Sequence, residues 1–147
     1  MAMTVRDVMT ASPACCTGAT SLTEVAKLMA RHDCGEIPVV QADGDRRPIG
    51  VITDRDIVVR TLAQGRNPAD CTVAECMSKP VVSVSEDSAL EECCDLMETH
   101  QIRRVPVVDG KGQLVGIVAQ ADIAMQASGR ATAEVVKQVS QPDSQRH

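Results

Sequence analysis

The chain has 147 residues and a formal net charge of -5, with 44% hydrophobic and 24% charged residues and no Phe, Trp or Tyr. This length fits one compact domain or two small units that share a core. The negative charge argues against a nucleic-acid or anionic-membrane surface, and the lack of aromatic rings removes the platforms on which single-stranded bases stack. We therefore expect neither nucleic-acid nor membrane partners.

The N-terminus and the cysteines indicate the compartment. No run of about 18 apolar residues is present, so we expect no membrane span. The first residues lack the basic and apolar regions of a signal peptide, and seven cysteines, an odd number, do not suit a secreted disulfide framework. We expect a cytoplasmic protein with reduced thiols.

The two halves of the chain repeat each other. Met9 and Met77 lie 68 positions apart, and Gly50 and Gly116 lie 66 apart. The two-residue difference falls in a turn, where insertions are tolerated. The comparison predicts repeat 1 (3–65), a linker (66–72), repeat 2 (73–129) and a C-terminal helix or partly disordered tail (130–147).

Each repeat is predicted to hold a lead-in turn, a short strand, a helix, two strands joined by a turn, and a second helix. In repeat 1 these elements are residues 5–9, 14–17, 22–32, 36–40, 49–52 and 54–63. In repeat 2 they are residues 73–77, 81–84, 89–100, 104–108, 114–118 and 120–128.

The first helix of each repeat has a recognisable start and an apolar face. Ser21 and Glu24 fit a capping box, as do Ser88 and Glu91, although the two boxes are one residue out of register and Thr20 is the alternative cap. Helical spacing predicts one buried face formed by Leu22, Val25, Ala26 and Met29.

The strand pairs decide the architecture. Asp43-Gly44 and Asp109-Gly110 predict hairpin turns, and the second strand of each hairpin is almost continuously apolar, which indicates burial on both faces. One repeat alone would expose a sheet face that a second repeat can cover. We expect an α/β (α+β) fold of two β-α-β-β-α repeats packed sheet to sheet with pseudo-twofold symmetry.

Ordered motifs that occur in both repeats carry a resemblance to a known family. They are 7–10 (DVMT) with 75–78 (ECMS), 37–40 (IPVV) with 102–108 (IRRVPVV), and 50–56 (GVITDRD) with 116–122 (GIVAQAD). Over residues 3–128 the chain resembles a tandem pair of CBS (cystathionine β-synthase) domains, a Bateman module. The resemblance implies a regulatory, non-enzymatic module without an obligatory cofactor. It also implies homodimers, a regulated partner protein, and two clefts that bind adenosine-containing ligands such as AMP, ATP, NAD or S-adenosylmethionine.

The end of each hairpin is the candidate ligand site. One carboxylate can accept both ribose hydroxyls, and the resemblance implies this role for Asp56, with Thr53 contacting ribose or phosphate and Arg55 beside them. Repeat 2 keeps the acid as Asp122 but has Ala119 in place of the threonine. The second site therefore lacks a hydroxyl contact worth about 1 kcal/mol.

A basic pair makes the two predicted clefts unequal. The resemblance implies that Arg103 and Arg104 reach a phosphate, whereas Glu36 at the matching place would repel one. We therefore expect the stronger cleft to combine Thr53 and Asp56 with this pair. Adenine is expected against the backbone near Cys15, Cys16, Ile37 and Pro38, or near Val82, Ser83, Val105 and Pro106 in the other cleft.

Plainer interpretations remain open at these positions. Asp56 and Asp122 can serve as acids at helix N-termini, and the two arginines as a solvated pair. Most cysteines are expected to act as small apolar residues, with no C-x-x-C metal spacing, and Cys34 and Cys71 are candidates for exposed redox sites. The alternatives to ligand sensing are thus a structural dimer with vestigial clefts and a thiol switch.

Overall fold

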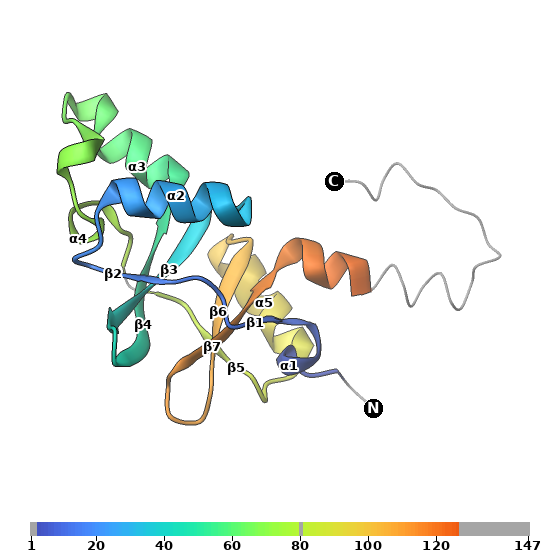
Figure 1. Cartoon of the computed structure of the whole chain (residues 1–147). Coiled ribbons are helices and arrows are strands. Elements are labelled where there is room, and N and C mark those ends of the chain that lie inside the picture. Colours follow the sequence, from blue (N-terminus) through green and yellow to red (C-terminus); the bar gives the residue numbers. More distant parts are fainter. Residues whose placement is uncertain (1–2, 80, 127–147) are drawn as a thin grey trace, which may run out of the picture.

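The computed structural model describes residues 3–79 and 81–126 (Figure 1). The predicted α/β fold with two sheets is confirmed. The first half contains α1 (Val5–Val8), β1 (Thr10–Ala11), β2 (Cys16–Thr17), α2 (Leu22–His32), β3 (Glu36–Ala42), β4 (Asp45–Thr53) and α3 (Asp54–Arg60). Short 3-10 turns follow, η1 (Leu62–Gln64) and η2 (Pro68–Asp70). The second half contains α4 (Val73–Cys76), β5 (Val84–Ser85), α5 (Leu90–His100), β6 (Arg104–Val108), β7 (Leu114–Ala119) and a helical segment at 120–126.

Each half builds its sheet in the same way. A short strand pairs parallel with the first hairpin strand, as β2 does with β3 and β5 with β6, and the hairpin itself is antiparallel. The strands β2 and β5 are shorter than predicted, because only two residues of each strand pair with the hairpin. The turns fall at the predicted Asp-Gly positions.

The lead-in segments, which extend to β1 in repeat 1 and to Ser78 in repeat 2, each pack on the opposite repeat. The sequence did not indicate this exchange. The strand β1 pairs antiparallel with β7, placing Thr10 opposite Ile117. In return, the Ser78 amide donates to the Val51 carbonyl over 2.8 Å, and the Val51 amide donates to the Ser78 carbonyl over 3.1 Å. Figure 1 shows the blue α1 and β1 among the yellow and orange elements of repeat 2. Because each lead-in lies on the opposite repeat, the two halves cannot separate without breaking both pairings.

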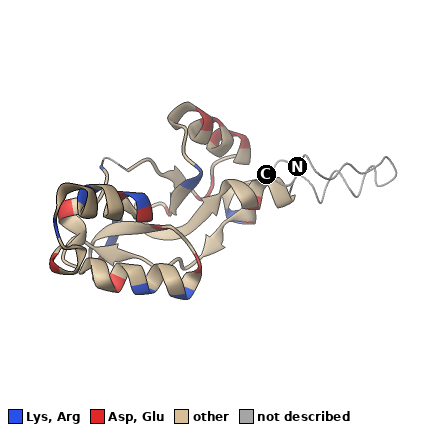
Figure 2. Cartoon of the chain, turned by 90° about the horizontal axis from the view of Figure 1, so that it is seen from above, with Lys and Arg blue, Asp and Glu red and all other residues tan. Residues whose placement is uncertain are grey.

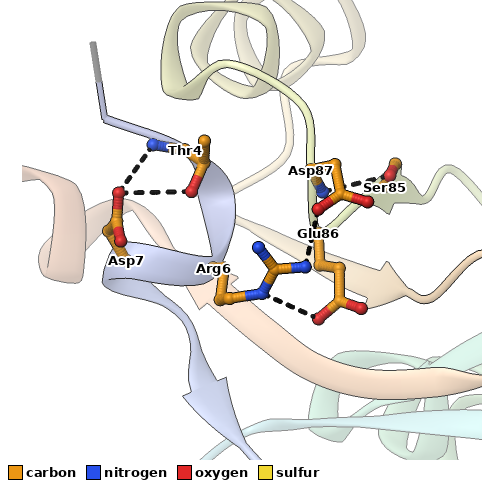
Figure 3. Close-up of polar contacts among 6 residues, drawn as sticks. All are labelled: Thr4, Arg6, Asp7, Ser85, Glu86 and Asp87. Atoms are coloured by element: carbon orange, nitrogen blue, oxygen red, sulfur yellow. Dashed lines mark hydrogen bonds and ion pairs between the residues drawn. The ribbon is translucent and has the colours of Figure 1, made fainter. Parts of the chain in front are cut away.

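Arg6 reinforces this exchange on the surface (Figure 3). Its guanidinium contacts the Asp87 carboxylate at 2.6 Å and the Glu86 carboxylate at 3.4 Å. The Thr4 amide donates to Asp7 over 2.9 Å and so caps α1. Since Arg6 is exposed, this ion pair orients the lead-in more than it stabilises the fold.

Two apolar clusters form the core. The first packs the buried side of α2 against β3 and β4, and it includes Val73, Cys76 and Met77 of the exchanged lead-in. The second packs α5 against β6 and β7, and it includes Val5 of the other lead-in. Leu22, Val25 and Met29 are buried as predicted, but Ala26 is exposed, because the buried face of α2 is narrower than the predicted one.

Charged residues lie mostly outside these cores. In Figure 2 the Lys, Arg, Asp and Glu residues colour the helices and loops, whereas the strands between them are largely tan. Within the described part of the chain, no helix has the length and apolar character that a membrane span requires.

The helix ends correct two expectations. Ser21 caps α2 as predicted, accepting from the Glu24 amide over 3.1 Å. In repeat 2 the N-cap position is Ala89, and the expectation that Ser88 caps α5 is wrong, because the Ser88 amide closes a turn on the Ser85 carbonyl. The helix predicted at 54–63 ends at Arg60 and continues as a 3-10 turn. The predicted elements beyond residue 126 lie outside the described residues.

All seven cysteines are free thiols. Cys16, Cys71, Cys76 and Cys93 are buried in the cores, so the expectation that Cys71 is exposed is wrong. Its segment packs on the start of α2, where the Leu22 amide donates to the Cys71 carbonyl. Burial raises the pKa of Cys16 to about 12 and of Cys93 to about 11, which disfavours the reactive thiolate at these positions.

Candidate functional site: a cleft between the two repeats

A cleft of about 360 Å³ opens between the repeats. This volume lies within the range of roughly 300–1,000 Å³ that is usual for small-molecule sites. The exchanged lead-in, the end of α2 with the start of β3, and β6, β7 and the following helix all contribute to it. Its lining residues are Thr10, Ser12, Pro13, Ala14, His32, Asp33, Cys34, Glu36, Ile37, Pro38, Arg104, Ile117, Ala119, Ala121 and Asp122. Both repeats therefore form its walls.

Asp122 is a half-buried carboxylate in the lining of this cleft. The Ala119 amide donates to its Oδ2 over 3.1 Å. Among residues 3–79 and 81–126, no hydrogen bond to its Oδ1 is found. The side chain is thus oriented by the start of the helix at 120–126 while one oxygen remains able to accept from a ligand hydroxyl.

The neighbouring wall is apolar and is built by the hairpins. Ile37 and Pro38 of β3 are buried, and Ile117 of β7 also lines the cleft. The Cys16 thiol donates to the Pro38 carbonyl at 3.7 Å, which ties β2 to this part of β3. Apolar side chains beside backbone polar groups suit one face and one edge of a planar heterocycle.

Glu36 and Arg104 occupy equivalent positions in the two repeats. They begin β3 and β6, where they pair with Thr53 and Ala119 respectively. Burial raises the pKa of Glu36 to about 6; the charge of Arg104 opposes that rise, and Asp56 adds to it. Glu36 therefore lies close to both the acid of its own repeat and the arginine of the other.

Asp56 has different surroundings from Asp122. It forms a capping box with Thr53: the Asp56 amide donates to Thr53 Oγ1 over 3.0 Å, and the Thr53 amide donates to Asp56 Oδ2 over 3.1 Å. The Ser78 hydroxyl lies 3.2 Å and 3.3 Å from the two carboxylate oxygens, and Arg60 lies 3.8 Å away. Both oxygens of Asp56 thus have partners within the protein.

The structure distributes the predicted site residues unequally. Ile37, Pro38, Arg104 and Asp122 meet in the cleft. Thr53 and Asp56 lie together beside Ser78, Arg55 and Arg103 are exposed, and Cys16, Val105 and Pro106 are buried in the strands. Val82 is half-buried and Ser83 exposed in the segment before β5. The pairing of Asp56 with the two arginines stays a prediction, and Arg104 lies in the cleft that holds Asp122.

The contribution of the exchanged lead-ins to the cleft and to the surroundings of Asp56 was not predicted from the sequence. Thr10 lines the cleft, and its counterpart Ser78 binds Asp56. The match between Met9-Thr10 and Met77-Ser78 was the available signal, but it does not say on which repeat each segment lies. His32 and Asp33 also line the cleft, since the end of α2 reaches it. No group of three or more potential metal ligands is found in the part of the chain that the structure describes.

Comparison with known proteins identifies the family. Residues 5–61 and 73–129 each match the family model of the CBS domain. The chain belongs to the CBS domain family. Hypoxic response protein 1 of Mycobacterium tuberculosis is 38% identical over 139 residues, which cover 95% of this CBS pair and 95% of that protein.

Solved structures share the fold. A crystal structure of Hypoxic Response Protein I with two coordinated zinc ions is 40% identical with a TM-score of 0.76, over 84% of this chain and 98% of that one. The CBS domain pair of protein MJ0100, in complex with 5′-methylthioadenosine and S-adenosyl-L-methionine, is 29% identical with a TM-score of 0.76, over 88% and 99% of the two chains. The resemblance found in the sequence is thereby confirmed at the level of family and fold.

Proposed function

We propose that this CBS pair is a non-catalytic regulatory module that binds an adenosine-containing small molecule in the cleft between its repeats. One observation carries the proposal: the half-buried Asp122 carboxylate, with an unengaged Oδ1 among the described residues, lines a ligand-sized cleft with an apolar wall. The bound ligands of the MJ0100 domain pair support the ligand class.

The cleft offers complementary groups for a nucleoside. Asp122 accepts from the ribose hydroxyls, because a carboxylate can take two donors at once. Ile37, Pro38 and Ile117 contact the adenine ring, which buries its apolar faces.

Binding can be transmitted because the cleft walls belong to both repeats. Thr10 enters the cleft from a strand that is paired with β7, and Ile37 enters it from the other sheet. A ligand that binds one relative arrangement of these walls more tightly shifts the population toward it.

The regulatory readout is proposed to pass through a homodimer. Large apolar side chains remain exposed on α3, on η1 and on the helix at 120–126, namely Val58, Val59, Leu62 and Met125. Such residues are candidates for a protein interface when they gather on helices that a second copy can cover.

Calorimetric titration with adenosine, AMP, ATP, NAD and S-adenosylmethionine tests the proposal. We expect at least one ligand to bind, and Asp122→Ala to weaken it about 10–100-fold through lost charge-assisted hydrogen bonds. Asp56→Ala should cost less affinity, because Asp56 is engaged by Ser78 and Thr53. Asp95→Ala, an exposed acid on α5, is the matched control.

Two results would contradict the proposal. If none of the five compounds binds, the structural-dimer interpretation is favoured instead. If Asp122→Ala binds as tightly as Asp95→Ala, the ligand does not use this cleft.

A further inference from the structure

The described lining of the cleft contains more carboxylates than Lys or Arg side chains. Its lining contains three carboxylates, Asp33, Glu36 and Asp122, and Arg104 is the one Lys or Arg among the described lining residues. Phosphate groups need positive charge or free helix N-terminal amides. Here the Ala119 amide at the start of the helix at 120–126 already binds Asp122.

Glu36 opposes the charge of the single arginine. Arg104 lies close enough to Glu36 to act on its ionisation, and both side chains are half-buried in the same lining. A carboxylate with a pKa of about 6 is still ionised above pH 7. The field of Arg104 inside the cleft is therefore partly offset by Glu36, and Asp33 and Asp122 add two further acidic side chains to the same lining.

We propose that this cleft selects adenosyl compounds without a phosphate group, neutral or cationic at the 5′ position, and that Glu36 is the residue that discriminates against phosphate. The inference rests on the proposed function of the cleft and specifies its ligand class. A thioether or a sulfonium at the 5′ carbon meets no charge repulsion here. A mono- or triphosphate places two or more negative charges near Glu36 and Asp33.

The pseudosymmetry supplies a direct test. Arg104 and Glu36 occupy equivalent strand positions, so the protein itself tolerates an arginine at this place in the fold. Glu36→Gln removes the negative charge, and Glu36→Arg reverses it. Glu91→Gln, at an exposed acid on α5 outside the cleft, changes the net charge by the same amount as Glu36→Gln and is the matched control for that variant.

Calorimetry at pH 8 and low ionic strength would compare 5′-methylthioadenosine, S-adenosylmethionine, AMP and ATP. We expect wild type to bind the first two at least about tenfold more tightly than the nucleotides, since one like charge within about 6 Å changes affinity by roughly this factor. The ratio of AMP to 5′-methylthioadenosine affinity should rise about tenfold in Glu36→Gln and further in Glu36→Arg. Glu91→Gln should leave the ratio unchanged.

The outcomes separate this inference from the function on which it rests. AMP or ATP binding to wild type as tightly as 5′-methylthioadenosine overturns the selectivity but supports the cleft as a nucleoside site. A ratio that is the same in wild type and Glu36→Arg removes Glu36 as its cause. Failure of all four compounds to bind overturns the inference, and failure of adenosine and NAD as well overturns the proposed function.

Discussion

Asp56 and Asp122 hold equivalent positions in the two repeats, yet their carboxylates have different partners. Each accepts a hydrogen bond from the backbone amide three residues before it. Asp56 is further engaged by the Ser78 hydroxyl, whereas Asp122 faces the cleft, where no second partner is found among the described residues. The same motif thus supports the helix start in one repeat and remains open to a ligand in the other.

The exchanged lead-ins account for this difference. Ser78 and Thr10 are counterparts, and each lies beside the acid of the opposite repeat through its pairing with Val51 or Ile117. Only the serine hydroxyl is turned onto its acid among the described contacts. A single side chain of the crossing segment can therefore decide whether the equivalent carboxylate is available.

The largest expected effects test the close approach of the lead-ins. A Cβ at Gly50 would lie 2.7 Å from the Ser78 carbonyl oxygen, which is backbone, whereas a Cβ at Gly116 would chiefly meet the flexible side chain of Met9. We expect Gly50→Ala to lower the free energy of unfolding by about 2–3 kcal/mol and Gly116→Ala by about 1–2 kcal/mol. Urea denaturation measures both.

The control for this pair is Gly44→Ala, which lies in an exposed turn with nothing within 4 Å of the new Cβ. Its cost should be within about 0.5 kcal/mol of zero. Equal costs for Gly50→Ala and Gly116→Ala would mean that the two crossings are packed alike, contrary to the structure.

The second effect concerns Glu36 and its counterpart Arg104. Burial raises the pKa of Glu36 to about 6, with Arg104 opposing the shift and Asp56 adding to it. Because the unfolded chain ionises near the ordinary value of 4.5, the raised pKa makes the free energy of unfolding fall as the pH rises from about 4.5 to about 6, and it stays lower above that. Glu36→Gln should therefore raise the free energy of unfolding by about 1–2 kcal/mol at pH 7.5, and the gain should disappear near pH 4.5.

Urea denaturation of Glu36→Gln and wild type at both pH values measures this difference. The exposed Glu91→Gln serves as the control and should show little change at either pH. A gain of equal size at pH 7.5 and pH 4.5 would assign the stabilisation to packing rather than to charge.

The sequence was sufficient for the local elements and for part of the site. Apolar spacing predicted α2 and α5, because it reports directly on a helix face. The position of Thr53 and Asp56 at a helix start followed from their place directly after an apolar hairpin strand. The exchange of β1 and Ser78 could not be predicted, because pairing between distant segments leaves no local periodicity. For the same reason the presence of Glu36 and Arg104 in one cleft, and hence the balance of charge there, became visible only in the fold.

The smallest effects are expected when the residues at the two equivalent N-cap positions, Thr53 and Ala119, are exchanged. Thr53 Oγ1 accepts from the Asp56 amide, so Thr53→Ala should cost about 1 kcal/mol. Repeat 2 has only the other half of this box, in which the Ala119 amide donates to Asp122. Ala119→Thr should add the missing hydrogen bond and raise the free energy of unfolding by about 0.5–1 kcal/mol.

Thermal unfolding of both variants with and without 5′-methylthioadenosine also tests whether the exchange affects ligand binding. The new hydroxyl would bind the Asp122 amide and leave Oδ1 unoccupied, so Ala119→Thr should remain stabilised by the ligand. If the variant gains stability but loses the ligand-dependent shift, the space beside Ala119 is needed for the ligand itself. If it gains no stability, the helix at 120–126 does not begin as α3 does, and the equivalence of the two acids is limited to their place in the sequence.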